Sequence, residues 1–250
     1  MNLGLADHTI VVTGASRGLG SAITRALLAE GANVVAAARS IDALDALASE
    51  APARTAAVAC DMRDREAVAG LVDAAIDRFG RLDAVVNNAG IAPAGKLVDT
   101  DLAVMEATLA VNLIAPAALA RAAAQHWISA DKPGAVVNIA STSGLKGKAL
   151  LAGYSASKGG MLRLTEALAG EWARHRIRVN AIAPGAFETD AQGAVLDDPD
   201  LLAKRLAKIP ARRMGAPEEI GPLTCYLASP LSSFVTGACF VIDGGEVAKL

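Results

Sequence analysis

The chain has 250 residues, of which 53% are hydrophobic, 20% charged and 3% aromatic, and its formal net charge is -2 at pH 7. This length suits one large α/β domain or two small ones, and it allows a substantial buried core. The small net charge and the lack of a run of lysines and arginines exclude a basic surface for nucleic acid.

Cysteine and histidine are too few and too scattered to suggest a disulfide framework or a metal site. The cysteines are Cys60, Cys225 and Cys239, and the histidines are His8, His126 and His175. An odd number of cysteines without a Cys-x-x-Cys pair predicts free thiols in a reducing compartment. No metal site is predicted.

Neither a membrane span nor a signal peptide is expected. No stretch of about 18 apolar residues runs without a charge or a turn signal, and the first ten residues, MNLGLADHTI, lack a signal-peptide pattern. We therefore expect a soluble, cytoplasmic protein.

A strand, a glycine-rich turn and a helix open the chain. Residues 9–12 are apolar and β-branched, TGASRGLG follows, and an Ala/Leu-rich helical stretch comes next. Gly14, Gly18 and Gly20 allow a sharp turn and a close approach to a phosphate, which N–H groups at the start of the helix would bind. The spacing Gly-x-x-x-Gly-x-Gly differs from the commoner Gly-x-Gly-x-x-Gly. A glycine turn can simply join a strand to a helix, but this context favours nucleotide binding.

The end of the second predicted strand, residues 33–37, bears on the choice of dinucleotide. An acidic residue about 20 positions past the glycines would bind the ribose 2′-hydroxyl of NAD, whereas arginine accommodates the 2′-phosphate of NADP. Here Ala38 and Arg39 occupy this place, and Arg17 lies within the glycine turn. The pattern favours NADP(H) over NAD(H), unless both arginines only face solvent.

Polar side chains end the third and fourth predicted strands. A helix at 41–49 and a strand at 55–59 lead to Asp61. Asp61 is placed either to accept a hydrogen bond from an adenine amino group or to cap the next helix, 65–79. The fourth strand, within LDAVVNNAG, runs into two asparagines and a glycine that we expect to support the floor of a cofactor site.

A long apolar helix at about 101–129 carries Asn112 near its middle. A helix that is hydrophobic nearly all round is buried or lies in a subunit interface. A polar amide there needs hydrogen-bond partners, so Asn112 is either a satisfied core residue or a functional one.

The remaining elements continue the alternation of strands and helices. They are a strand in AVVNIAS, a helix at about 154–175, a strand in IRVNAIAPG, a helix at about 217–228 and a strand at 239–242. The irregular region 186–215 is long enough to form a lid or substrate loop. No linker or repeat divides the chain, so we predict a single α/β domain over residues 1–250, with about seven strands in a doubly wound parallel Rossmann-type sheet.

Tyr154 and Lys158 form the pattern with the most definite chemical consequence. Four residues apart on a helix, they project from the same face. A positive charge about 4 Å from a phenolate supplies about 4 kcal/mol at an effective dielectric of about 20, which would lower a tyrosine pKa by roughly three. Such a tyrosine can exchange a proton with an alcohol oxygen, although the same spacing also occurs by chance on surface helices.

In these motifs the chain resembles the short-chain dehydrogenase/reductase family in its compact form. The matches cover nearly the whole chain in the family's order: Thr13-Gly14-x-x-x-Gly18-x-Gly20, Asn87-Asn88-Ala89-Gly90, Asn112, Ser141, Tyr154-x-x-x-Lys158, Pro184-Gly185 with Thr189, and Asp243-Gly244-Gly245. The carboxyl-terminal third is similar to the gluconate 5-dehydrogenase and related sugar-acid dehydrogenase branch. Similar segments also occur in 3-oxoacyl-carrier-protein reductases and secondary alcohol dehydrogenases.

The resemblance implies four catalytic residues: Asn112, Ser141, Tyr154 and Lys158. Tyr154 would be the general acid in carbonyl reduction and the base in alcohol oxidation, while Lys158 would lower its pKa and bind the nicotinamide ribose. Ser141 would hold the substrate oxygen, with the next two residues as competing assignments. Asn112 would hold a water in a proton relay.

The resemblance also implies a cofactor site and an assembly. The expected cofactor contacts are Gly14, Ser16, Arg17, Gly18, Leu19, Gly20, Arg39, Asp61, Met62, Asn88, Ala89, Gly90, Tyr154, Lys158, Pro184, Gly185 and Thr189. Asp61 and Asn88 would meet the adenosine half, and Pro184, Gly185 and Thr189 the nicotinamide end. Because the family is largely tetrameric through its two long helices, a homotetramer is implied.

The implied function is NADP(H)-dependent hydride transfer between the nicotinamide and a ketone or secondary alcohol, with a small molecule as substrate. The alternatives are a 3-oxoacyl thioester reductase and a non-catalytic dinucleotide-binding regulator, since a fold alone does not determine a function. The intact set of four catalytic residues counts against the regulator.

Two sets of side chains near the expected site suggest different substrates. The lysines are Lys96, Lys146 and Lys148, and the apolar side chains are Leu150, Leu151 and Phe187. The lysines would attract a carboxylate or phosphate unless they are simply solvated, whereas the apolar set suits a hydrophobic ketone. The sequence leaves both open.

Overall fold

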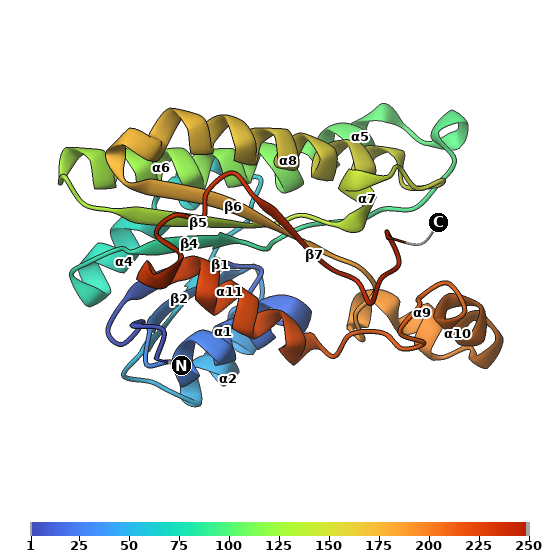
Figure 1. The fold of residues 1–250 in the computed structure, drawn as a ribbon, viewed down its shortest axis with the longest axis horizontal. Coiled ribbons are helices and arrows are strands. Elements are labelled where there is room, and N and C mark those ends of the chain that lie inside the picture. The colour runs from blue at the N-terminus through green and yellow to red at the C-terminus, as the bar shows by residue number, and fades with distance from the viewer. Residues whose placement is uncertain (1, 249–250) are drawn as a thin grey trace.

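Seven short runs of apolar residues form one parallel sheet in the computed structural model, which describes residues 2–248 (Figure 1). The strands are β1 (Thr9–Thr13), β2 (Asn33–Ala38), β3 (Thr55–Ala59), β4 (Ala84–Asn87), β5 (Gly134–Ile139), β6 (Ile177–Pro184) and β7 (Cys239–Ile242). Their order in the sheet is β3-β2-β1-β4-β5-β6-β7. The chain therefore reverses its direction of winding between β1 and β4, which is where ligands bind in such sheets.

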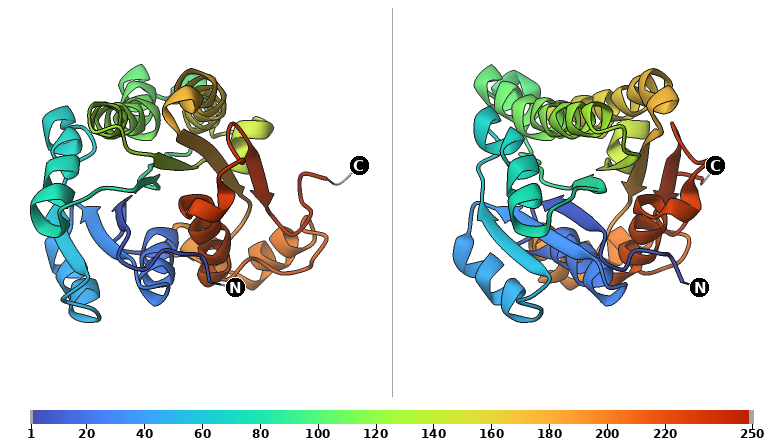
Figure 2. Two further views of the ribbon diagram at one scale, coloured as in Figure 1. Left: turned by 60° about the vertical axis from the view of Figure 1, so that its left-hand side comes forward. Right: turned by 90° about the vertical axis from the view of Figure 1, so that its left-hand side faces the viewer.

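Helices cover both faces of the sheet (Figure 2). One face carries α1 (Gly18–Ala29), α2 (Ile41–Ser49) and α11 (Gly221–Ala228), and the other carries α3 (Arg65–Ala69), α4 (Leu71–Phe79), α5 (Leu102–Leu109), α6 (Ala115–Ser129) and α8 (Ala152–Trp172). The predicted doubly wound sheet is thus confirmed. Short 3₁₀ turns occur at Leu97–Asp99, Ala173–His175, Asp190–Gln192, Pro217–Ile220 and Pro230–Ser232.

The two helical layers explain why the strands are continuously apolar. Along β1, Val11 packs into the core under α4 and α6, whereas Ile10 and Val12 pack into the core under α1 and α11. All five residues of β1, all four of β4 and all six of β5 are buried. A strand covered on both faces has no solvent side, so a polar and apolar alternation is not expected there.

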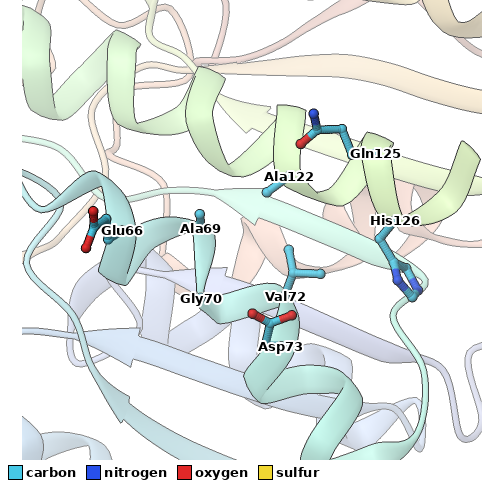
Figure 3. A pocket seen from close by; sticks show the side chains of 8 residues that line it. All are labelled: Glu66, Ala69, Gly70, Val72, Asp73, Ala122, Gln125 and His126. Atoms are coloured by element: carbon cyan, nitrogen blue, oxygen red, sulfur yellow. The ribbon is translucent and has the colours of Figure 1, made fainter. Parts of the chain in front are cut away.

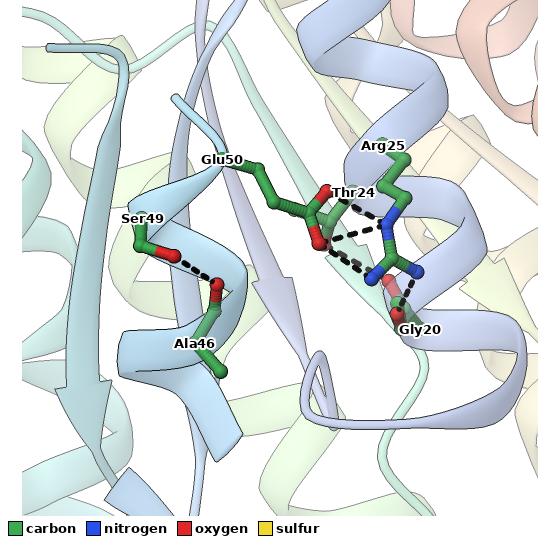
Figure 4. Close-up of polar contacts among 7 residues, drawn as sticks. Gly20, Thr24, Arg25, Ala46, Ser49 and Glu50 are labelled. Carbon is green, nitrogen blue, oxygen red and sulfur yellow. Dashed lines mark hydrogen bonds and ion pairs between the residues drawn. The ribbon is translucent and has the colours of Figure 1, made fainter. Parts of the chain in front are cut away.

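The glycine turn leads into a helix that is tied to its neighbour by surface contacts (Figure 4). Arg25 of α1 donates to both carboxylate oxygens of Glu50, just after α2, at 2.7 to 3.2 Å, and to the Ser21 hydroxyl at 2.7 Å. Both partners of the ion pair are about half exposed, so its contribution to stability is about 1 kcal/mol or less.

Two of the predicted helices are interrupted. The predicted helix 65–79 is divided at Gly70 into α3 and α4, and glycine is a poor helix former. The predicted helix 101–129 contains a π-helical segment, Ala110–Ile114, between α5 and α6. This segment holds Asn112, whose amide is hydrogen bonded outside the helix as described below.

The run Leu102–Ser129 is long and apolar enough, by length and composition alone, to cross a membrane. It is the one such helix in residues 2–248. Helices in the core of a water-soluble fold pass the same test, and here α6 packs on β4 and β5 and α5 packs on α8. We therefore describe it as a helix of the sheet's outer layer, with exposed apolar side chains at Leu102, Val104, Ile114 and Ile128.

The region 186–215 is folded rather than irregular throughout. It contains α9 (Gly193–Leu196) and α10 (Pro199–Leu206), which lie beyond the carboxyl ends of the strands, to the right in Figure 1. A further short helix, α7 (Thr142–Leu145), follows β5 at the same end. The three cysteines are free thiols, of which only Cys239 is exposed.

Candidate functional site

The glycine turn after β1 has no room for side chains. A Cβ on Gly20 would lie 2.1 Å from the Gly14 carbonyl oxygen, and one on Gly14 would lie 2.8 Å from Cα of Ala89. Gly14 and Gly18 also have φ of +66° and +53°, where residues with side chains are strained. The turn is compact because Gly14 and Gly20 carry no side chains. The same lack of side chains allows a phosphate to approach the backbone closely.

The helix that follows begins without a capping side chain. Arg17 is the N-cap residue of α1 and makes no side-chain cap hydrogen bond, and the first turn holds no acidic residue. The first N–H groups of a helix lack intrahelical partners and favour an anion. The turn and the start of α1 therefore fit the pyrophosphate of a dinucleotide, with Ser16, Arg17 and Leu19 alongside.

Asn88 supports this turn from the neighbouring strand. Its amide nitrogen donates to the carbonyl oxygens of Thr13 at 2.9 Å and Gly14 at 3.2 Å. In return, the Thr13 hydroxyl accepts the backbone N–H groups of Asn88 and Ala89, both at 3.1 Å. The asparagine expected to form the cofactor floor is therefore a brace between β4 and the glycine turn.

Asp61 does not cap the helix after β3. That cap is Asp64, whose carboxylate accepts the N–H groups of Glu66 and Ala67. Asp61 instead forms a bidentate pair with Arg63, with a shortest distance of 2.5 Å, and this pair lowers the pKa of Asp61 to about 2. The capping alternative is thus wrong, and a hydrogen bond from Asp61 to an adenine would have to be shared with Arg63. Its neighbour Met62 is buried.

The two arginines that favoured NADP are both exposed. Arg39 follows the last residue of β2, and its charge contributes to lowering the pKa of Asp61 at the end of β3. The hydrogen bonds and ion pairs formed within residues 2–248 include neither the Arg39 nor the Arg17 guanidinium group. Both charges are therefore available on the edge of the sheet where β2 ends.

Asn112 is fully buried and makes three hydrogen bonds. Its amide oxygen accepts the Ile91 N–H at 2.8 Å, and its amide nitrogen donates to the Ile91 carbonyl at 2.8 Å and to the Ser157 hydroxyl at 3.0 Å. Ser157 in turn donates to the Tyr154 carbonyl at 2.7 Å. The π-helical segment therefore joins the loop after β4 to the first turn of α8.

Ser141 lies two residues after the end of β5 and directly before α7. Its hydroxyl accepts the N–H of Ser143 at 3.0 Å as the N-cap of that helix, and its side chain lowers the pKa of Tyr154. The competing residues Thr142 and Ser143 are both buried, and the Thr142 hydroxyl has no hydrogen-bond partner in residues 2–248. Of the three residues, Ser141 is the one whose side chain affects the pKa of Tyr154.

Lys158 is buried next to the Tyr154 ring. Its ammonium group donates to the Ile139 carbonyl at 2.6 Å and lies 5.9 Å from the centroid of the Tyr154 ring. Complete burial lowers the pKa of Lys158 to about 8. Gly90 approaches the same space, because a Cβ there would lie 3.7 Å from the Lys158 nitrogen.

The acidity of Tyr154 differs from the prediction. Burial raises the pKa of the phenol, and the side chain of Ser141 opposes this by lowering it. Burial is the larger of the two effects, so the pKa of Tyr154 is raised on balance. The predicted lowering of this pKa is thus not seen in the chain alone, in which Tyr154 is the protonated phenol that could donate to a carbonyl oxygen.

The expected nicotinamide end lies at the carboxyl end of β6. A Cβ on Gly185 would lie 2.6 Å from Cβ of Asp243, so this glycine allows the segment after β7 to approach Pro184. Thr189 reaches the glycine turn, since a Cβ on Gly18 would lie 3.5 Å from its methyl group. Chain positions far apart in sequence are therefore neighbours along this edge.

Of the apolar side chains considered for the substrate, only Leu150 is clearly exposed, at 54%. Phe187 is 4% exposed and packs on Gly215 in the core beside α1 and α11. It lines a small hollow of about 70 Å³ together with Asp243 and Gly244. The apolar set is thus not a continuous open surface.

A larger open hollow, of about 420 Å³, lies between α3, α4 and α6 (Figure 3). Its polar side chains are those of Glu66, Asp73, Gln125 and His126. None of the residues predicted for the site lines it. No group of three His, Cys, Asp or Glu side chains that could hold a metal occurs in residues 2–248.

Ser157 is the site residue that the sequence analysis missed. It lies directly before Lys158 in YSASK, and only the structure shows that it is fully buried and bonded to Asn112. Serine hydroxyls often bond within their own helix, so the sequence carries no signal for a contact with a distant asparagine.

We expect Ser157→Ala to lower the free energy of unfolding by about 1 to 3 kcal/mol, because one buried amide hydrogen of Asn112 loses its acceptor. Denaturant unfolding of the two proteins measures the difference. Ser129→Ala is the matched control, since the Ser129 hydroxyl is exposed and bonds only the His126 carbonyl. Equal losses in both variants would contradict the importance of the Asn112 contact.

The chain resembles known proteins over nearly all of its length. Residues 14–246 match the protein family described as enoyl-(acyl carrier protein) reductase. The chain is 40% identical to 3beta-hydroxysteroid dehydrogenase 1 of Eggerthella lenta, covering 96% of this chain and 94% of that protein. It is 35% identical to the 3-oxoacyl-[acyl-carrier-protein] reductase of Thermotoga maritima, covering 97% and 99%. A solved structure assigned as a 2-deoxy-d-gluconate 3-dehydrogenase of Agrobacterium tumefaciens, with bound NADP, has a TM-score of 0.91 at 35% identity and 99% coverage of both chains.

Proposed function

Because the chain belongs to the short-chain dehydrogenase/reductase family, whose named members act on alcohol and carbonyl groups, we propose that it is an NADP(H)-dependent oxidoreductase of a ketone or secondary alcohol. The observation that carries the proposal is the chain of hydrogen bonds from Asn112 through Ser157 to the turn of α8 that holds Tyr154. Two packed helices need no buried asparagine on one and buried lysine on the other for stability alone, yet Asn112 and Lys158 both lie next to Gly90.

In this proposal each of these residues moves or orients a proton. Tyr154 donates its proton to the carbonyl oxygen in reduction and takes it back in oxidation. Ser141 binds that oxygen by a hydrogen bond. Lys158 and Asn112 provide the buried polar groups through which the proton of the tyrosine is replaced. The bound nicotinamide supplies or accepts the hydride. The glycine turn, the start of α1 and the edge formed by Pro184, Gly185 and Thr189 would orient it.

We expect Arg39→Ala to weaken NADPH binding about 10-fold or more while changing NADH binding little, because a charge-assisted hydrogen bond to the 2′-phosphate contributes about 1.5 to 3 kcal/mol. Titration of the protein with each nucleotide measures this. Arg78→Ala, an exposed arginine at the end of α4, is the control. Tighter binding of NADH than of NADPH by the unaltered protein would overturn the preference for NADP.

The reductase of 3-oxoacyl thioesters is the second candidate, favoured by the similarity to the Thermotoga maritima enzyme. It predicts that activity rises with acyl-chain length and requires a carrier protein or coenzyme A. Initial rates of NADPH and NADH oxidation should be measured with keto sugar acids, 3-oxoacyl thioesters, ketosteroids and aryl or alkyl ketones. Turnover of one class identifies the substrate, and no turnover of any class would contradict the proposed enzyme.

A cytoplasmic homotetramer is the assembly that we propose. The run from α5 to α6 exposes Ile114 at 42% and Ile128 at 41%, and in this proposal these apolar side chains belong to the subunit interface. Light scattering after size-exclusion chromatography should give a tetramer, and the double variant Ile114→Glu, Ile128→Glu a smaller species. A monomeric unaltered protein would exclude this assembly.

A further inference from the structure

The structure distinguishes Lys148 from the other two lysines near the site. Its backbone N–H donates to the Ser155 hydroxyl at 3.2 Å, and its carbonyl accepts the Leu151 N–H at 3.2 Å. Ser155 directly follows Tyr154 in α8. Lys148 is therefore held against the first turn of the helix that carries the proposed acid.

Charged residues of two later segments of the chain influence Lys148 electrostatically. Arg205 and Lys208 come from α10 and the residues after it, and Asp243 and Glu246 come from the segment after β7; all four influence the pKa of Lys148. Figure 1 shows α10 and the carboxyl-terminal segment at the same end of the sheet as α7. Asp243 also abuts Gly185, so this group of charges extends to the proposed nicotinamide end.

The two carboxylates in the group already have partners. Both oxygens of Glu246 accept from Arg205, at 2.5 and 2.7 Å, and both side chains of this pair are less than a fifth exposed. The two oxygens of Asp243 accept the N–H groups of Gly245 at 2.8 Å and Val247 at 2.7 Å. Both carboxylates thus have partners, and within residues 2–248 neither forms an ion pair with Lys148.

The positive charges of the group are in excess. Lys146 donates to the Val247 carbonyl at 3.2 Å, but no hydrogen bond or ion pair within residues 2–248 involves the ammonium group of Lys148. Lys148 is half-buried, and burial lowers its pKa, which Glu246 partly opposes. A partly desolvated ammonium group without an anion is unfavourable, and a bound anion would remove that cost.

We propose that Lys148 forms an anion subsite that binds a negatively charged group of the substrate, with Lys208 adding a second positive charge from the lid. The substrates would then be oxo acids or hydroxy acids, or carbonyl compounds attached to a phosphate-bearing carrier. This inference rests on the proposed oxidoreductase function. The neighbouring pair of Arg205 and Glu246 would fasten α10 over the subsite.

The test compares charged and neutral forms of the same substrate. A keto acid is measured against its amide, and a 3-oxoacyl-coenzyme A against the corresponding N-acetylcysteamine thioester. In one of the two pairs, we expect Lys148→Gln to lower kcat/KM for the charged substrate about 10-fold to 100-fold, mainly by raising KM. The kcat/KM for the neutral substrate of that pair should change by no more than about twofold. The pair that responds tells whether the anion is a carboxylate or a phosphate.

Two variants serve as controls. Lys146→Gln removes a lysine whose ammonium group has a backbone partner, and Lys96→Gln removes an exposed lysine on the loop that meets Leu150 through the Gly95 N–H. Both should leave the preference for the charged substrate intact. Melting temperatures of all three variants check that each is folded.

The inference is overturned if the unaltered enzyme turns over each neutral member as well as its charged partner, or if Lys148→Gln impairs both members equally. In either case turnover still occurs, so the proposed oxidoreductase stands. Absence of turnover with every compound, in the unaltered protein too, would instead contradict the proposed function itself.

Discussion

Tyr154→Phe is expected to reduce turnover by about 10²-fold to 10⁴-fold, the usual contribution of a positioned general acid. The substitution removes only the hydroxyl group and keeps the ring beside Lys158. NADPH should still bind and the melting temperature should change little, because the substitution keeps the aromatic ring and the Ser157 contact with the Tyr154 carbonyl. Single-turnover rates with a responsive substrate, together with nucleotide titration, measure both expectations.

The protein provides its own control for this experiment. Tyr226 in α11 is the second of only two tyrosines, and Tyr226→Phe should leave turnover unchanged. Retained turnover in the Tyr154→Phe variant would exclude Tyr154 as the acid. Nucleotide binding without turnover in both the unaltered protein and the variant would instead support the non-catalytic regulator.

Lys158→Met is expected to have the second large effect, a loss of about 10²-fold in turnover together with a change in how stability depends on pH. Methionine has a similar shape and no charge, so the core should remain filled. The Ile139 carbonyl loses its donor, which shifts the stability of the variant by an amount that does not depend on pH.

The pH dependence follows from the depressed pKa. Lys158 titrates near 8 in the folded chain and near 10.5 when unfolded, so between these values the unfolded state binds the additional proton. Stability therefore rises with pH across this window, and the full cost of the buried charge is present below pH 8. Relative to Lys158→Met, the free energy of unfolding of the unaltered protein should increase by about 3 kcal/mol from pH 8 to pH 10.5.

Denaturant unfolding of both nucleotide-free proteins at several pH values gives this difference directly, and subtraction cancels the titration of all other groups. Lys132→Met, an exposed lysine after α6, should run parallel to the unaltered protein. If the stability of Lys158→Met also depended on pH in the same way as that of the unaltered protein, Lys158 would have an ordinary pKa despite its burial.

The sequence alone determined the sheet and the positions of its ends. Apolar runs bounded by glycine and polar residues identified all seven strands, and β3, β7 and α2 begin and end where predicted. Such elements are predictable because strand burial and helix periodicity are local in sequence. Since all seven strands are parallel, the residues that follow them gather at one edge, and most of the predicted site lies there.

The tertiary structure alone decided which polar groups pair. Asp61 bonds Arg63 rather than capping α3, and burial raises the pKa of Tyr154, which the sequence had predicted to be lowered. The contact between Asn112 and Ser157 joins positions 45 apart, and that between Arg205 and Glu246 joins positions 41 apart. Partners this distant leave no periodic trace, because hydrogen bonds and desolvation depend on the final packing of side chains.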